Sequence, residues 1–376
     1  MITRTQADKL RTTRADEPAV ISVYLTVPLD LAQHRGLPTR ARELVKAAAI
    51  DTPEQCGAQV RGTDLDAVAQ AVSVHSHEWL GHTAAIFACA DVGLFEVVPL
   101  PGTLPELAVI AARPYIRPLL ASIQRHPAYR AALVDTRYAW ILNISDDHIE
   151  TVAERKDPGV PSTGFSGWWG LEGYRVQQRI MTLSKQHFKD TIAILERTID
   201  SERRPLVLGG HEAEINQFLG TLPKAVRQDV AGSVNVDLQT VTPGRMRELA
   251  TPVIDHWVQE SEEQLVTDVL NQPPNTAVTT RLNGCLAASR ARAVAHLVLP
   301  DGQLVPGYAC DTCGALSATS ADCDCPDPQQ TCRAVPDLLD ELANRTLDSG
   351  GKVTSVRKAP FTVAARLRFP VAAATS

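Results

Sequence analysis

Five of the eight cysteines lie in one short stretch near the carboxyl end, at spacings typical of a metal site. They are Cys310, Cys313, Cys323, Cys325 and Cys332. In Cys310-x-x-Cys313-Gly314 a tight turn directs two thiolates at one ion. Cys323 and Cys325 would complete a tetrahedral zinc site, with Cys332 as the substitute for either, since their spacing is unusually short. Four cysteine ligands leave no open position, so the predicted zinc is structural. The alternatives are unmetalled thiols or a disulfide.

A second candidate site is a glycine- and proline-rich stretch, residues 156–173, which holds two adjacent tryptophans. Trp168 and Trp169 are flanked by Gly167, Gly170 and Gly173. Tryptophan stacks on nucleobases with ~1–3 kcal/mol per base, which predicts an RNA-binding loop. The alternative is that one tryptophan packs against its own domain.

Basic side chains follow this stretch along the sequence, namely Arg175, Arg179, Lys185 and Lys189. On a helix they suit contacts with RNA phosphates, and the alternative is a solvated helix face.

The elements that must position these residues indicate a mixed α/β chain. Alternating apolar and polar residues over 21–25 predict a half-buried strand, and residues 131–144 predict a hairpin. Apolar residues at helical spacing over 176–199 predict a long helix after the glycine-rich stretch. Further helices are predicted over 243–263 and 277–291.

With 376 residues, the chain is predicted to fold as three α/β domains in series. Their bounds are 1–125, 126–258 and 259–376, and the Cys-rich insertion occupies about 307–333 of the last domain.

The composition of the chain limits the kinds of partner that it is expected to bind. The formal net charge of −6 argues against a protein coated in basic residues, although it leaves room for a local RNA contact. The first residues contain no apolar signal segment, and no apolar run is long enough to span a membrane. We therefore expect a cytoplasmic protein without a membrane partner.

Several passages in a fixed order resemble the bacterial relatives of the archaeo-eukaryotic release factors and Pelota. They are ISVYL near the start, ALVDTRYAWILNI, LVLGGHEAEINQFLGTLP, and NTAVTTRLNGCLAASRARAVAHLVLPDGQLVPGYACDTCG near the end. The resemblance covers nearly the whole chain. It implies an RNase H-like middle domain and a carboxyl-terminal domain that resembles kink-turn-binding ribosomal proteins and holds an inserted zinc ribbon.

The resemblance also implies a ribosome-binding translation factor that occupies the A site in ribosome hibernation or rescue. Its expected partners are the ribosome, through rRNA and tRNA. One branch of the group, the Balon-like hibernation factors, contacts elongation factor Tu, so that protein or a related GTPase is a further expected partner.

Release factors of this group carry a Gly-Gly-Gln loop ahead of the long middle-domain helix, and the glutamine helps to place the hydrolytic water. This chain has no Gly-Gly-Gln there, which favours a factor that is not an enzyme. The alternative is a peptidyl-tRNA hydrolase or peptide release factor with a divergent loop, in which Glu172 or Gln177 would serve as the catalytic group.

Overall fold

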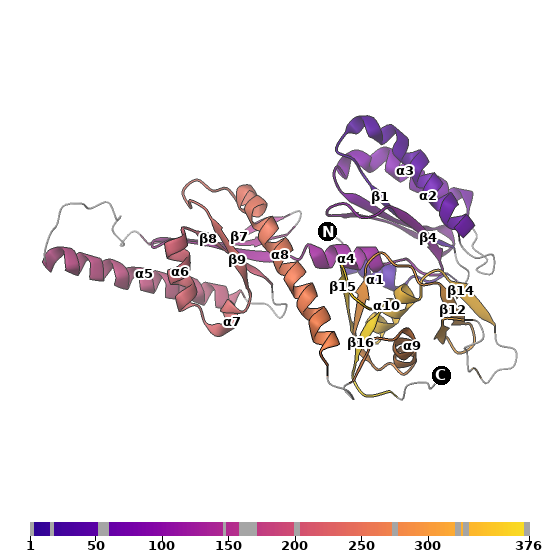
Figure 1. The fold of residues 1–376 in the computed structure, drawn as a ribbon. Helices are drawn as coiled ribbons and strands as arrows, with labels where there is room; N and C mark the ends of the chain where they lie inside the picture. Colours follow the sequence, from indigo (N-terminus) through magenta and orange to yellow (C-terminus); the bar gives the residue numbers. More distant parts are fainter. Residues whose placement is uncertain are drawn as a thin grey trace. The chain divides into compact units, whose positions relative to one another are not determined.

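The computed structural model describes residues 4–15, 19–51, 60–145, 148–157, 171–198, 204–272, 277–319, 325 and 331–371. Contacts between Cα atoms divide the chain into two compact units. Unit 1 combines the two ends of the chain, residues 1–124 and 262–376, and unit 2 is residues 125–261 (Figure 1). The predicted bounds of three domains in series stay a prediction.

The amino-terminal part of unit 1 is an antiparallel sheet with helices on both faces. Its strand order is β3-β2-β1-β4. The strands are β1 (Val20–Thr26), β2 (Thr83–Cys89), β3 (Leu94–Leu100) and β4 (Leu107–Ala111), and the helices are α1 (Arg4–Thr12), α2 (Leu37–Asp51), α3 (Gly62–His75) and α4 (Arg117–Arg125). Apolar residues of α2 and α3 cover one face, and Leu10 of α1 and Leu119 of α4 lie in the core cluster of the other.

Unit 2 is built on a mixed five-stranded sheet of order β7-β6-β5-β8-β9. β5, β6 and β7 are antiparallel neighbours, whereas β8 and β9 run parallel to β5. The strands are β5 (Tyr129–Val134), β6 (Tyr138–Ile144), β7 (Ile149–Lys156), β8 (Leu206–Gly210) and β9 (Val230–Asn235), and the helices are α5 (Leu171–Arg197), α6 (Glu212–Thr221), α7 (Lys224–Arg227) and α8 (Pro243–Leu270). The first three helices bury one face of the sheet, and α8 buries the other.

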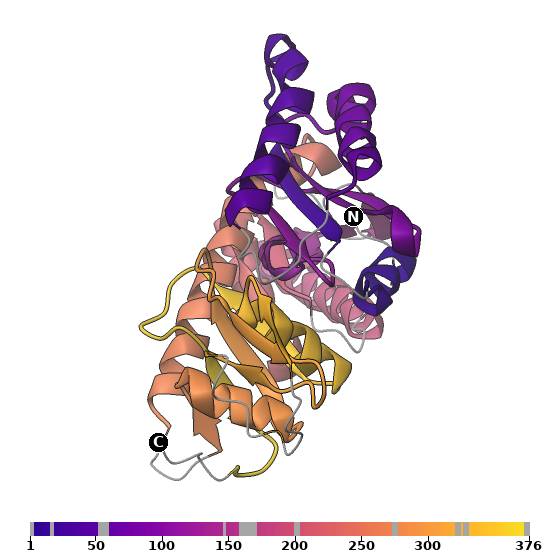
Figure 2. The ribbon, with the colours of Figure 1, turned by 90° about the vertical axis from the view of Figure 1, so that its right-hand side faces the viewer.

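The carboxyl-terminal part of unit 1 holds a four-stranded sheet of order β10-β16-β11-β15, drawn in orange and yellow in Figure 2. A separate three-stranded sheet, β13-β12-β14, follows β11 in the chain. The elements are β10 (Val278–Thr279), α9 (Leu282–Arg290), β11 (Val294–Pro300), β12 (Gly307–Cys310), β13 (Leu316–Ser317), β14 (Cys332–Val335), α10 (Leu338–Asp348), β15 (Lys352–Val356) and β16 (Ala364–Leu367). α9 and α10 share the larger core, and the last turns of α8 lie in a smaller one with Val298 and Val356.

Most predicted elements are confirmed, and the differences are local. The predicted helix over 277–291 is wrong at its start, because Val278 and Thr279 pair with β16 and the helix begins at Leu282. α5 begins at Leu171, so Glu172 and Gly173 lie in its first turn instead of in a loop. α1 was not anticipated, since its short sequence has few apolar residues. Within the described residues, no helix is both long enough and apolar enough to cross a membrane.

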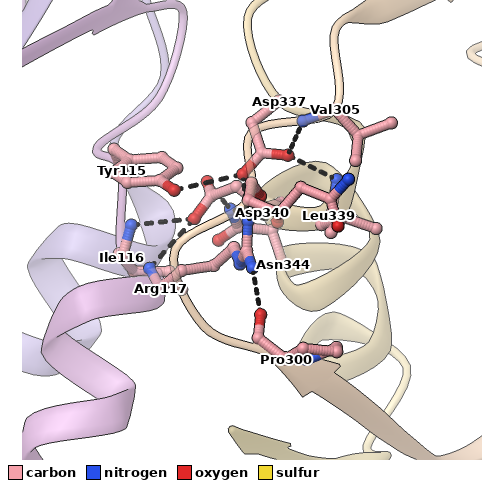
Figure 3. Close-up of polar contacts among 10 residues, drawn as sticks. Tyr115, Ile116, Arg117, Pro300, Val305, Asp337, Leu339, Asp340 and Asn344 are labelled. Carbon is pink, nitrogen blue, oxygen red and sulfur yellow. Dashed lines mark hydrogen bonds and ion pairs between the residues drawn. The ribbon is translucent and has the colours of Figure 1, made fainter. Parts of the chain in front are cut away.

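A buried polar network joins the two parts of unit 1 (Figure 3). The Arg117 guanidinium lies 2.5 Å from Asp337 Oδ2 and also donates to the carbonyl oxygens of Gln303 and Pro300. Tyr115 donates its hydroxyl hydrogen to the same Asp337 oxygen, at 3.1 Å. The side chains of Arg117 and Asp337 are only 6% and 1% exposed. Each charge therefore depends on the other, because water does not reach either.

Asp340 adds a second set of bonds to this network. Its Oδ1 accepts hydrogen bonds from the backbone N–H groups of Ile116 and Arg117, and its Oδ2 accepts one from Asn344. Burial raises the pKa of Asp340 well above its usual value, and the negative charges of Asp337 and Glu341 add to the increase. The backbone bonds hold the start of α4 against the first turn of α10.

We predict that Arg117→Met lowers the free energy of unfolding of unit 1 by about 3–5 kcal/mol, because it leaves the Asp337 carboxylate buried without its cation. Urea denaturation measures this value. The matched control is Arg61→Met, which removes an exposed ion pair with Asp91 and should cost under about 1 kcal/mol. Equal losses of unfolding free energy in the two variants would show that the buried network stabilises unit 1 no more than an exposed ion pair does.

Candidate functional site

The cysteine cluster lies on the small three-stranded sheet of unit 1. The sulfur atoms of Cys310, Cys313 and Cys325 lie within 4.8 Å of one another. Cys310 ends β12 and is buried, Cys313 is exposed in the following turn, and Cys325 is partly buried. The sequence thus correctly predicted that the Cys-x-x-Cys turn and Cys325 come together.

Backbone geometry shapes the turn for two converging sulfurs. The Cys313 N–H lies 3.5 Å from Cys310 Sγ, and Gly314 N donates to the Cys310 carbonyl oxygen. Gly314 has a φ of +70°, which side chains with a Cβ rarely adopt. Such N–H groups stabilise thiolate charge, which metal binding requires.

A tetrahedral site would need a fourth ligand, which Cys332 or Cys323 would have to supply. Cys332 starts β14 and pairs directly with Cys310 in the strand register, which brings it close to the cluster. Cys323 lies outside the described residues. Four sulfurs around zinc at ~2.3 Å would stand about 3.8 Å apart, so the three observed sulfurs fit a tetrahedral site with little adjustment.

The remaining described cysteines differ from the cluster in chemistry. Burial raises the pKa of the Cys285 thiol to about 12 and also raises that of Cys89. Both thiols therefore lose a proton, which metal binding requires, less readily than an ordinary cysteine. Among the described residues, only the Cys310 cluster groups three potential metal ligands.

The second feature is the amino-terminal half of α5, which extends beyond the sheet of unit 2 (Figure 1). From residue 178 to residue 183 no side chain is fully buried, and Met181 is 48% exposed. Burial begins at Ser184, and Phe188 is fully buried. Among the described side chains of α5, packing into the core therefore begins at Ser184.

Basic side chains share one side of this helix. Arg179, Lys185 and Lys189 are exposed, and at 3.6 residues per turn they fall within about a third of the helix circumference. None of them forms an ion pair with a carboxylate of the described residues. The side chains of Glu172, Arg175 and Gln177 are not described, although all three belong to α5.

The predicted stacking residues Gly167, Trp168, Trp169 and Gly170 lie outside the described residues. Gly173 lies within α5. Their role in binding RNA stays a prediction.

An ion cluster that the sequence did not reveal ties α5 to the end of β7. Asp157 Oδ2 lies 2.6 Å from His187 Nδ1 and 2.9 Å from Arg155 Nε, and Arg155 also contacts Asp190 at 2.7 Å. The hydrogen bond from Arg155 is the largest cause that lowers the pKa of Asp157, and His187 adds to it. Asp157 is the second residue of the glycine-rich stretch, so the cluster fixes the point where that stretch starts. No local sequence pattern reveals this cluster, because thirty positions separate Asp157 from His187.

Residues 114–262 match the family model described as Bacterial archaeo-eukaryotic release factor family 10. No curated protein gives a match to this chain. Among solved structures, Archaeoglobus fulgidus Pelota is 16% identical, with 77% of this chain and 80% of that chain covered and a TM-score of 0.37. S. cerevisiae Dom34 is 10% identical over 77% and 80% of the two chains, with a TM-score of 0.40. An archaeal translation termination factor is 12% identical over 97% and 96%, with a TM-score of 0.24.

We predict that the purified chain holds one metal ion, bound by Cys310, Cys313 and Cys325 together with Cys332 or Cys323. Elemental analysis under reducing, chelator-free conditions measures the content. Cys310→Ser should lower it to near zero, whereas Cys285→Ser should leave it unchanged because that thiol is buried elsewhere in the fold. Metal-free wild-type protein, or equal metal content in the two variants, would contradict the site.

Proposed function

We propose, from the match of residues 114–262 to the model of bacterial archaeo-eukaryotic release factor family 10, that this chain is a ribosome-binding translation factor. The match carries the proposal because it spans β5 to β9 and the helices α5 to α7. We further propose that the factor occupies the A site during ribosome hibernation or rescue.

The shape and charge of α5 support contact with RNA. Its first half extends beyond the sheet of unit 2, and Arg179, Lys185 and Lys189 lie on one side of it without an ion pair to a carboxylate of the described residues. Ribosomal RNA offers closely spaced phosphates, with which lysine and arginine interact favourably. A local basic surface of this kind is compatible with the net charge of −6 of the whole chain.

The finer fold assignments also belong to the proposal. The strand order of unit 2, with three antiparallel strands followed by two parallel ones, supports an RNase H-like middle domain. The three clustered sulfurs support zinc as the metal of an inserted ribbon. We propose a structural role for this zinc, since four cysteine ligands would leave no position for a substrate.

We propose that the chain does not efficiently release peptides. The sequence lacks Gly-Gly-Gln ahead of α5, and Glu172 and Gly173 belong to a helix. A carboxylate such as that of Glu172 would add unfavourable negative charge among RNA phosphates near the peptidyl ester. Elongation factor Tu or a related GTPase remains the proposed protein partner.

We predict that the chain co-sediments with ribosomes at low salt and dissociates as salt rises, because basic side chains contact phosphates. Arg179→Gln with Lys185→Gln should weaken binding and reduce the slope of log affinity against log salt by roughly 1 to 2. The matched control is Lys224→Gln with Arg245→Gln, which removes the same charge from other exposed positions of unit 2. Absence of co-sedimentation at low salt, from both growing and starved cells, would sink the proposed function.

We predict little peptide release when the chain is added to stalled ribosomes that carry peptidyl-tRNA. The assay measures free peptide against a release factor that has Gly-Gly-Gln. Release at a stoichiometric rate or faster that disappears in Glu172→Ala or Gln177→Ala would establish the hydrolase alternative instead. Unchanged release in both variants would point to another catalytic group and would equally contradict this prediction.

A further inference from the structure

A cavity of about 370 Å³ in unit 1 lies beside the cysteine turn and is lined by arginines from distant parts of the chain. Cys310, Cys313 and Gly314 form part of its wall. The arginines come from the segments after α1 and β4, from α9 and its end, from β14 and from α10. They are Arg14, Arg113, Arg290, Arg292, Arg333 and Arg345.

Negative charge in the lining does not balance these six arginines. Two lining carboxylates, Glu341 and Asp348, face them. Arg113 contacts Asp348 at 3.2 Å, and Arg333 contacts Asp311 at 3.3 Å. The other four arginines form no ion pair with a carboxylate of the described residues. The cavity therefore concentrates positive charge in a chain whose net charge is negative.

The arginines of the cavity also repel one another. Burial is the largest cause that lowers the pKa of Arg345, and the positive charges of Arg113, Arg14 and Arg333 lower it further. Glu341 acts in the opposite direction without reversing the shift. Bringing guanidinium groups together costs free energy, which a bound anion would offset.

Ser289 and Arg292, at the end of α9, also line the cavity. Ser289 Oγ is buried and has no hydrogen-bond partner among the described residues. Arg292 has a φ of +52°, an uncommon backbone state for a residue with a side chain, and its N–H bonds to the Ser289 carbonyl oxygen. Together with the bond from the Ala293 N–H to the Ala288 carbonyl oxygen, this backbone state forms the left-handed cap that ends α9, and it places Arg292 on the wall of the cavity.

We propose that this cavity is a binding site for a phosphate-bearing ligand. Guanidinium groups match phosphate oxygens with paired hydrogen bonds, and several arginines around one cavity favour phosphate over a single carboxylate. The volume suits one or two phosphate groups together with part of the molecule that carries them. The backbone of RNA and a free phosphorylated compound share this chemistry. The site lies in unit 1, so it goes beyond the proposed role of α5.

The test measures binding of two probes to the full chain at low salt. Inorganic pyrophosphate is titrated by calorimetry, and a short fluorescein-labelled RNA is followed by fluorescence anisotropy. The pocket variant is Arg14→Gln with Arg290→Gln, since both side chains are exposed and form no ion pair with a carboxylate of the described residues. The control variant is Arg42→Gln with Arg61→Gln, which removes the same charge from surface ion pairs of unit 1. Thermal unfolding of each variant confirms that it is folded.

The pocket variant should bind at least one probe about tenfold more weakly, and the control variant should stay within about twofold of wild type. Weaker binding of RNA alone identifies the RNA backbone as the source of the phosphate. Weaker binding of pyrophosphate, with or without RNA, identifies recognition of the phosphate group itself. No binding of either probe by wild type, or equal affinity in the two variants, would overturn the proposal. Ribosome co-sedimentation is a separate measurement, so failure here leaves it unaffected.

Discussion

The buried ion pair between Arg117 and Asp337 is the constraint on which unit 1 depends. A charge removed from water is tolerated only with a close partner and saturated hydrogen bonds, and here the partners are 220 positions apart in the chain. Asp337 also caps α10, because its Oδ1 accepts the Leu339 N–H at 3.0 Å. One side chain therefore both starts a helix of the carboxyl-terminal part and holds the amino-terminal part against it.

The same contact assembles the arginine cavity. Arg113 lies four positions before Arg117 in the chain, and Arg345 and Asp348 follow Asp337 on α10. Fixing Arg117 on Asp337 brings Arg113 within 3.2 Å of Asp348 and into the field of Arg345. The start of α10 thus supplies the carboxylate that pairs with the buried Arg117. The last turns of α10 face a cavity in which arginines outnumber carboxylates. A structural contact and a proposed binding site share one helix.

Local patterns in the sequence were enough for the elements whose side chains follow a clear period. The hairpin of β5 and β6 and the long helix α5 are examples. α1 and β10 were missed because a short segment takes its structure from tertiary contacts that local propensity does not contain. The cysteine turn was predictable because its two thiols are neighbours in the chain.

The remaining features of the sites could not be predicted, because their residues are far apart in the chain. The Asp157–His187 contact and the arginine cavity unite residues from separate segments, and no spacing rule in one sequence relates them. The join between the two ends of the chain in unit 1 is of the same kind, since Arg117 and Asp337 look like ordinary surface residues until they are paired. The surroundings of an arginine also could not be predicted from sequence: Arg345 is half-buried among other arginines, whereas Arg179 is exposed on α5.

Competition with tRNA tests most directly whether the chain acts in the ribosomal A site. Ribosomes programmed with messenger RNA and peptidyl-site tRNA would be prepared with the A site either vacant or filled by a cognate aminoacyl-tRNA, and the affinity of the full chain measured for each. Occupation of the A site by the chain predicts binding to the vacant ribosomes and at least tenfold weaker binding to the filled ones. Equal binding to both, or binding to neither, would contradict it.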